Sequence, residues 1–276
     1  MLRIGNRLFL SLAILMFQPV SYTQLRELGS DAPNPVSHVL PELLTRGMCS
    51  MPFDETGCNN SRTHRIRKGT ALNMIQAGNT EGISDIIRFV LEIDKLKRVL
   101  RKVKPTGEDR YENTAEHSWQ IALFALSLAQ VVEISVDVNR VIAMLLVHDL
   151  GEIDAGDKFV FAQDGWEDRR VAELRAVERI CDIAPLKVAD WLITLWKEFD
   201  EGGTSEARFA KAIDRCMPIL LNLSNQGGSW LENGVTYERV VGRVGPEIEN
   251  GCPELWTYMK AKLEEGRRKG FFAATS

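Results

Sequence analysis

Apolar residues recur at helical spacing along this chain almost without a break from Thr80 onward, and this pattern restricts the fold more than any other feature. No stretch alternates apolar and polar residues between hairpin turns, which is the pattern typical of β-strands. The sequence also contains no internal repeat and no glycine-rich phosphate loop. Gly202-Gly203 and Gly227-Gly228 are expected to mark loops between helices. An all-α fold is therefore predicted.

The N-terminal part differs in character from the rest. The length of 276 residues allows one large domain or two small ones, and 45% hydrophobic residues can build a sizeable core. The first 75 or so residues show no sustained periodicity and carry a net charge of +3, against −7 for the remainder. We predict a poorly ordered N-terminal extension over residues 1–78, followed by one folded domain over residues 79–276.

An apolar stretch near the N-terminus leaves three interpretations open. Arg3 and Arg7 precede Leu8–Phe17, an order typical of a signal peptide, but no clean small-x-small cleavage site follows. Ten apolar residues are too few to cross a bilayer, so no membrane span is predicted. The segment is a signal or targeting peptide, a membrane-surface anchor, or an upstream extension that the working protein lacks. We favour the extension, with Met74 as the candidate physiological start.

Cysteine content and charge restrict the compartment and the partners. Cys49 and Cys58 lie in the extension and Cys181, Cys216 and Cys252 in the helical part, an odd total with no close C-x-x-C pair. A disulfide framework is therefore not expected. We expect a cytoplasmic location, because that compartment is reducing. The overall charge of −4 argues against bulk binding to nucleic acid.

Two of the four histidines, His117 and His148, lie in strongly helical segments. Asn113 is followed three residues later by Glu116, a pattern close to the capping box, so a helix is expected to start at Asn113. His117 then lies in the first turn, on the apolar face of that helix. Taken alone, such a histidine is more often a core residue with one satisfied hydrogen bond.

A second helix, expected to start near Asp137, carries polar side chains on an apolar face. On it His148, Asp149 and Glu152 should point the same way, along with Val141, Met144 and Leu145. Burying these groups without partners is costly, whereas a divalent cation stabilises neutral imidazole and ionised carboxylate together. Ordinary hydrogen bonding would need several partners at once. A metal site is therefore the leading hypothesis.

Asp214 adds another carboxylate within an apolar helical run, residues 210–221. Alone, it is more simply explained by a salt bridge to Arg215 or by a surface position. Together with His117, His148 and Asp149, it would supply two nitrogens and two oxygens to an ion. This mixed set suits Mn²⁺, Fe²⁺, Co²⁺, Ni²⁺ or Zn²⁺ better than Mg²⁺ or Ca²⁺, and the metal's identity stays open.

The order of these residues resembles the H…HD…D signature of the HD-domain metal-dependent phosphohydrolases. Three blocks resemble the bacterial 5′-deoxynucleotidase branch in particular: residues 112–120 (ENTAEHSWQ), 148–157 (HDLGEIDAGD) and 209–215 (FAKAIDR). The resemblance covers about Ile83 to Phe272, so it begins after Met74. It implies a compact multi-helix HD-domain bundle with the metal site in its core, and a homodimer.

The resemblance also implies roles for residues outside the metal set. Arg98, in Lys-Arg-Val, occupies the position of the family's phosphate-binding arginine, and Asp157 matches a position near the nucleoside sugar, where it could bind the 3′-hydroxyl. Glu152 lies one turn beyond His148, so it can reach a metal-bound water and exchange its proton. The simpler alternative for Glu152 is an exposed carboxylate at a helix end. Val99 stands where some relatives have tryptophan, which leaves discrimination between deoxyribose and ribose open.

The function implied by the resemblance is a metal-dependent 5′-nucleotidase that releases phosphate from deoxyribonucleoside 5′-monophosphates. The nearest rivals hydrolyse cyclic nucleotides or nucleoside triphosphates. A rival from another class is a non-catalytic nucleotide-binding module that keeps its metal for structure. Glu152 argues against that module, because a structural site has no need of a carboxylate that faces water.

Overall fold

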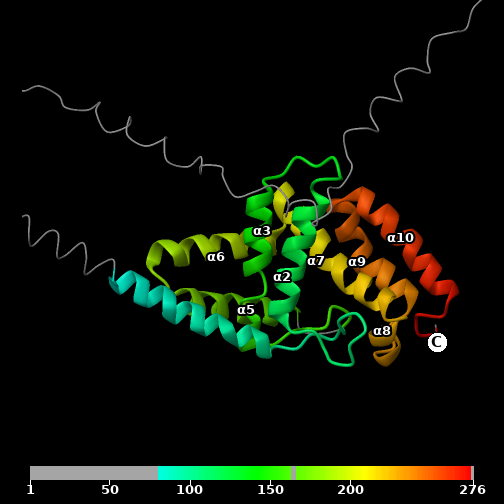
Figure 1. The fold of residues 1–276 in the computed structure, drawn as a ribbon, viewed down its shortest axis with the longest axis horizontal. Helices are drawn as coiled ribbons and strands as arrows, with labels where there is room; N and C mark the ends of the chain where they lie inside the picture. Colours follow the sequence, from blue (N-terminus) through cyan, green and yellow to red (C-terminus); the bar gives the residue numbers. More distant parts are fainter. Residues whose placement is uncertain (1–79, 163–165, 275–276) are drawn as a thin grey trace, which may run out of the picture. The chain divides into compact units, whose positions relative to one another are not determined.

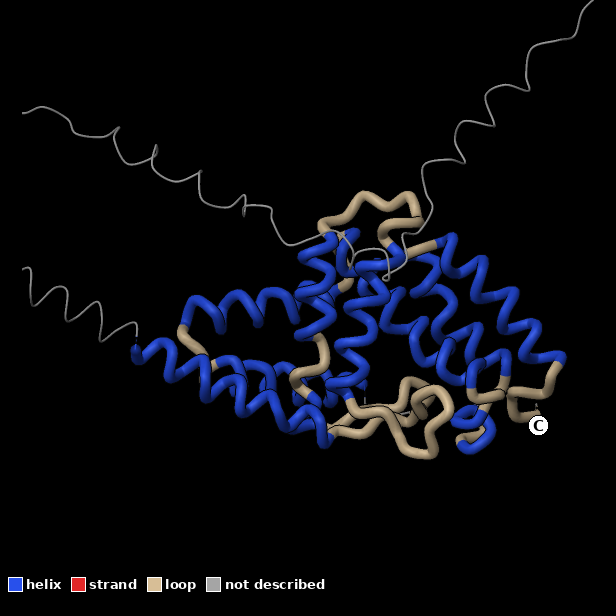
Figure 2. Tube along the Cα trace, viewed as in Figure 1, coloured by secondary structure: helices blue, strands red, loops and turns tan. Residues whose placement is uncertain are grey.

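The computed structural model describes residues 80–162 and 166–274, which form a bundle of helices (Figure 1). Within these ranges no β-strand occurs, and an isolated antiparallel bridge joins Leu100 to Asn113 (Figure 2). The predicted all-α fold is confirmed. A helix over residues 80–93 is followed by η2 (Asp94–Arg98), α2 (Thr114–Leu128), α3 (Val138–Val147), α4 (Glu152–Ala155), α5 (Trp166–Cys181), α6 (Leu186–Glu201), α7 (Ser205–Ser224), α8 (Gly228–Glu232), α9 (Tyr237–Gly251) and α10 (Pro253–Arg268).

Both predicted helix starts are confirmed. Asn113 is the N-cap of α2: its side chain accepts from the backbone N–H of Glu116, and the Glu116 side chain accepts from the backbone N–H of Asn113. This reciprocal pair is a capping box, which satisfies N–H groups that have no partner within the helix. Asp137 caps α3 in a similar way, because its carboxylate accepts from the backbone N–H groups of Asn139 and Arg140.

The helix that carries the HD pair ends earlier than the sequence pattern indicates. α3 stops at Val147, and a tight turn, in which the N–H of Glu152 donates to the carbonyl of Asp149 over 3.0 Å, leads into α4. Gly151 lies in this turn, where a Cβ atom would lie 2.8 Å from the carbonyl oxygen of Glu173 on α5. Only glycine allows so close an approach of the two backbones. His148 and Glu152 are nevertheless both buried.

Two predicted loop glycines adopt left-handed backbone conformations. Gly202, with φ of 69°, ends α6, and Gly227, with φ of 80°, precedes α8. Residues with a Cβ atom are strained at such angles, so glycine is the natural residue at these helix boundaries.

The helices enclose two apolar clusters that meet at α3. The first lies among α2, α3, α7, α9 and α10 and contains the fully buried Ile121, Val141 and Phe209. The second lies among the helix over residues 80–93, α3, α5 and α6 and contains Met144 and Val177. α2, α3 and α7 pack against one another in the middle of the bundle. α5 and α6 lie on one side of them, and α9 and α10 lie on the other (Figure 1). Side chains from α2 and α7 and from the residue that follows α3 therefore converge in the interior.

The cysteines of the described part, Cys181, Cys216 and Cys252, are buried and form no disulfide. No helix among the described residues is long and apolar enough to cross a membrane. Leu8–Phe17 and Met74, on which the N-terminal interpretations depend, lie outside the described residues.

Candidate metal centre and catalytic cavity

Three buried side chains from separate elements form the centre of the site. His117 lies in the first turn of α2, His148 follows the last residue of α3, and Asp214 lies in the middle of α7. One ligand atom from each lies within 4.8 Å of the others. Oδ1 of Asp214 is 3.0 Å from Nε2 of His117 and 3.7 Å from Nε2 of His148. We call these three residues, His117, His148 and Asp214, the metal group, because they could hold a metal ion.

The His148 ring is oriented to present one nitrogen to that centre. Nδ1 donates to the carbonyl oxygen of Leu145 over 2.9 Å, whereas Nε2 is buried and makes no hydrogen bond. Burial opposes a charged imidazole, but Asp149 and Asp214 outweigh it and raise the pKa of His148 to about 10. The surroundings thus favour a positive charge at Nε2. A divalent cation supplies that charge, so the residues fit a metal ion.

Asp214 divides its two carboxylate oxygens between different partners. Oδ1 faces the two histidines, and Oδ2 accepts from Nη1 of Arg215 over 2.9 Å. The salt bridge that the sequence offered as an alternative therefore coexists with the metal group. Burial raises the pKa of Asp214. The charge of Arg215 and the contacts with the two histidines outweigh that effect and hold this pKa well below its usual range.

Asp149 joins the histidine group to an arginine. Its Oδ2 lies 3.0 Å from Nε2 of His148 and accepts from Nη1 of Arg101, also over 3.0 Å. Burial raises the pKa of Asp149, but His148 and Arg101 outweigh that effect and lower it. The carboxylate is therefore held ionised beside the three residues of the metal group.

Glu152 is buried, with 6% of its surface exposed, so it is not the exposed helix-end carboxylate of the simpler alternative. The hydroxyl of Thr114 donates to its Oε2 over 2.9 Å, and Nη2 of Arg169 lies 4.0 Å from its Oε1. Burial, and then the charge of Asp149, raise the pKa of Glu152 well above its usual value. A buried carboxylate with a raised pKa next to a metal group is a common arrangement for proton transfer.

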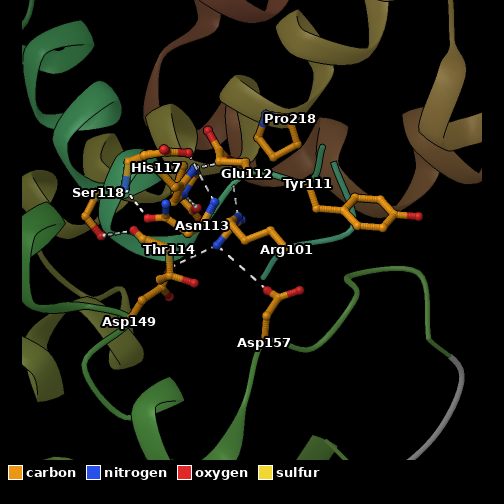
Figure 3. Close-up of polar contacts among 12 residues, drawn as sticks. Arg101, Tyr111, Glu112, Asn113, Thr114, His117, Ser118, Asp149, Asp157 and Pro218 are labelled. Atoms are coloured by element: carbon orange, nitrogen blue, oxygen red, sulfur yellow. Dashed lines mark hydrogen bonds and ion pairs between the residues drawn. The ribbon is translucent and has the colours of Figure 1, made fainter. Parts of the chain in front are cut away.

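Asp157 lies next to Arg101, and in Figure 3 it lies below that side chain, away from His117. Its Oδ1 is 3.8 Å from Nη1 of Arg101, and burial raises its pKa. It follows Gly156, whose φ of 74° turns the chain after α4, and Arg169 donates to the Gly156 carbonyl.

These groups face one cavity of about 490 Å³, which His148, Asp149, Glu152, Asp157 and Asp214 help to line. The lining contains eight basic and eight acidic side chains. A bound divalent cation would therefore make the lining net positive. Such a cavity attracts an anionic ligand.

Arg98 does not belong to this cavity. It is exposed at the end of η2, whose inward side chain is Leu96. Arg101, three residues further on, lines the cavity instead. Residues 99–103 alternate between inward and outward positions, with Leu100 58% exposed and Val103 4% exposed. The residue types in this segment, V-L-R-K-V, do not alternate in polarity, so no sequence signal identifies Arg101.

The first motif block, residues 112–120, also contains two more residues of the centre to which the sequence assigns no role. Thr114 holds Glu152, and Glu112, 1% exposed, places Oε2 3.4 Å from Nδ1 of His117. The structure thus brings together six residues singled out in the sequence and leaves Arg98 outside. The six are His117, His148, Asp149, Glu152, Asp157 and Asp214.

Comparison with known proteins places this chain in a family. Residues 93–256 match the HD domain family. A solved structure from Magnetospirillum magnetotacticum MS-1, described as a predicted metal-dependent phosphohydrolase, is 40% identical, with a TM-score of 0.66 over 70% of this chain and 96% of that one. The 5′-deoxynucleotidase HDDC2 of Mus musculus is 27% identical over 64% of this chain and 90% of its own length. The protein of the same name from Bos taurus is 26% identical over 66% of this chain and 89% of its own. The resemblance drawn from the three motif blocks is confirmed, and the chain belongs to the HD domain family.

Proposed function

We propose that the protein is a metal-dependent phosphohydrolase that releases phosphate from deoxyribonucleoside 5′-monophosphates. The observation that carries this proposal is that His148 and Asp214 of the metal group line one cavity together with the buried Glu152 and Arg101. The name shared by the curated relatives and the description of the Magnetospirillum protein support the same class of reaction.

His117, His148, Asp149 and Asp214 are the proposed metal ligands. Two imidazole nitrogens and two carboxylates suit Mn²⁺, Fe²⁺, Co²⁺, Ni²⁺ or Zn²⁺. The ion would supply positive charge that lowers the pKa of a water molecule and polarises the phosphorus of the ester. The hydrogen bond from His148 to Leu145 and the ion pair of Asp214 with Arg215 orient two of these ligands.

Glu152 is the proposed group that moves the proton. It takes a proton from the attacking water and returns it to the departing 5′-oxygen. Thr114 holds one of its oxygens, which fixes the direction of the carboxylate. Burial and the charge of Asp149 raise its pKa toward the range in which a carboxylate exchanges protons readily.

Arg101 takes the phosphate-binding role that the sequence resemblance assigned to Arg98. Its planar guanidinium can contact two phosphate oxygens at once. Burial lowers the pKa of Arg101, but the charges of Asp149 and Asp157 outweigh that effect and raise it. The side chain therefore stays positive. Its position between those two carboxylates sets it beside the metal group and beside the proposed sugar-binding residue.

Asp157 is the proposed contact to the 3′-hydroxyl, since a carboxylate that lines the cavity can accept a hydrogen bond from the sugar. Val99 packs against the second apolar cluster and does not line the cavity. A preference for deoxyribose is therefore proposed from the relatives' names alone.

The experiment that tests this function is a phosphate-release assay on the full chain. Metal is removed with a chelator, and the protein is reloaded separately with Mn²⁺, Co²⁺ or Zn²⁺. Deoxyribonucleoside 5′-monophosphates should release phosphate faster than ribonucleotides, 3′-monophosphates, cyclic nucleotides or triphosphates. Glu152→Gln should keep its metal while kcat falls by about 10²–10⁴-fold.

Other outcomes of the same assay would replace the proposal. Preferential hydrolysis of cyclic nucleotides or triphosphates would change the substrate class. A metal-loaded chain that binds nucleotides but hydrolyses none would instead be a non-catalytic binding module.

The two arginines can be separated by mutation. Arg101→Ala should lower kcat/KM by about 10²-fold or more, because a charge-assisted contact to the phosphate is lost in the transition state. Arg98→Ala, which removes an exposed guanidinium from the same segment, should leave kcat/KM within about twofold. Steady-state kinetics and metal analysis of both variants provide the measurement. A large loss in Arg98→Ala with a normal Arg101→Ala would restore the original assignment.

We also propose that residues 79–276 form the working domain and that the protein acts in the cytoplasm. The family match begins within that range, and the three buried free cysteines are compatible with a reducing compartment. A shortened chain that begins at Met74 should fold and retain activity. Recovery of the protein from an oxidising compartment after cell fractionation would reject the location.

A further inference from the structure

Glu112 occupies a position that its backbone fixes closely. It precedes the N-cap of α2, and its N–H donates to the carbonyl of Val103 while its own carbonyl accepts from the N–H of Arg101, both over 2.9 Å. Its side chain is only 1% exposed. A buried carboxylate is costly unless other polar groups surround it, so its neighbours explain why it is there.

Those neighbours are a proposed metal ligand and the proposed phosphate-binding arginine (Figure 3). Oε2 of Glu112 lies 3.4 Å from Nδ1 of His117 and 3.6 Å from Nε of Arg101. All three atoms are buried, and none makes a hydrogen bond. Both nitrogens can carry a proton and the oxygen can accept one, so a closing movement of a few tenths of an ångström would bring them to hydrogen-bonding distance.

We propose that Glu112 is a positioning residue that couples the metal site to the phosphate-binding arginine. By accepting the Nδ1 proton of His117, it selects the tautomer whose Nε2 lone pair faces the metal group. Carboxylates behind metal-bound histidines act in this way. The same oxygen holds Nε of Arg101 and leaves Nη1 beside Asp149. The role toward Arg101 rests on the proposed function.

A purely structural role makes different predictions. If Glu112 only neutralised the buried charge of Arg101, its loss would destabilise the fold without changing the metal affinity of the folded molecules. The affinity for a metal, measured without substrate, therefore distinguishes positioning from neutralisation.

The first experiment titrates the metal-free full chain with Co²⁺ alone. Glu112→Gln should weaken Co²⁺ binding by about 10–100-fold and raise KM for a deoxyribonucleoside 5′-monophosphate. Glu116→Gln is the matched control, because Glu116 lies four residues away in the capping box and pairs with Arg110 at the surface. Glutamine can keep that cap, so Co²⁺ affinity should stay within about twofold. Unchanged affinity in a folded Glu112→Gln protein would overturn the proposal.

A second experiment decides the question even if Glu112→Gln does not fold. In the unmodified chain loaded with Zn²⁺, NMR of His117 should show metal on Nε2 and an Nδ1 proton that is shifted downfield and protected from exchange by a hydrogen bond to a carboxylate. Metal on Nδ1, or an Nδ1 proton without these signs of a hydrogen bond, would overturn the proposal. Neither measurement uses substrate, so a failure of phosphate release would reject the proposed function while these two results still decide the role of Glu112.

Discussion

At the scale of single residues, the hydroxyl of Thr114 makes the hydrogen bond that orients the carboxylate of Glu152. It donates to Oε2 over 2.9 Å, and both side chains are buried. An oxygen that loses its donor in such surroundings is left unsatisfied, at a cost of about 1–3 kcal/mol. The carboxylate is then free to turn away from the position in which it would exchange a proton with water.

We predict that Thr114→Val, which is nearly isosteric, lowers kcat by about tenfold, since one lost hydrogen bond of this size corresponds to that factor in rate. Thr114→Ser keeps the donor and should restore most of kcat. Ser118→Ala is the control, because Ser118 on the same helix donates from its hydroxyl to the Thr114 carbonyl and not to Glu152. Equal losses in Thr114→Val and Thr114→Ser would attribute the effect to packing.

At the scale of elements, Glu198 on α6 links three helices. Its Oε2 accepts from Nε of Arg140 on α3 over 2.8 Å, and its Oε1 accepts from the hydroxyl of Thr204, the N-cap of α7, over 2.7 Å. The contact with Arg140, only partly opposed by burial, lowers the pKa of Glu198 below its usual value of 4.5. His148 directly follows α3 and Asp214 lies on α7, so Glu198 joins the two segments that hold these proposed ligands.

A carboxylate whose pKa is lower in the folded state stabilises the fold above its unfolded pKa, and this contribution is lost as the pH falls through the folded pKa. Glu198→Gln should therefore reduce the free energy of unfolding by about 1 kcal/mol at neutral pH. The difference from the unmodified chain should shrink as the pH falls below about 4.5. Denaturant titrations over a pH series measure it, with Asp190→Asn, an exposed change on the same helix, as control. A difference that does not depend on pH would exclude the ion pair as its cause.

At the scale of the whole molecule, one helix face is apolar and exposed. On the helix over residues 80–93, Ile83, Ile87, Val90 and Leu91 follow one another at helical spacing and are 52–68% exposed, while Phe89 packs into the second apolar cluster. Contiguous apolar surface of this kind is typical of interaction sites. The family resemblance predicts a homodimer, and this face is the surface that we assign to a second copy.

Leu91→Lys combined with Ile87→Lys should convert a dimer into a monomer without loss of helix content, because both side chains face solvent in the single chain. Light scattering over a concentration series measures the mass, and circular dichroism checks the fold. Lys95→Glu, an exposed change just beyond the same helix, is a control for added or removed charge. An unmodified chain that stays monomeric at every concentration would reject the assignment.

Much of the architecture followed from the sequence because it depends on local patterns. Helical spacing of apolar residues predicts the all-α fold, and Asn113 and Asp137 predict two helix starts, because capping uses groups within three residues of each other. The end of α3 was not predicted, since it depends on how closely α5 approaches Gly151. That approach is a contact between segments distant in the chain.

The sequence by itself determined the family, the helical fold and the chemical types of the central residues, because motif order and helical periodicity are written along the chain. Only the tertiary structure decided which of two arginines faces the cavity. Arg98 and Arg101 lie where a short 3₁₀ helix is followed by extended chain. Neither the helical repeat nor the two-residue alternation of a strand extends far enough there to predict the direction of a side chain. The burial of Glu112 and the bond from Thr114 to Glu152 were likewise decided by packing, because they join segments that no local pattern relates.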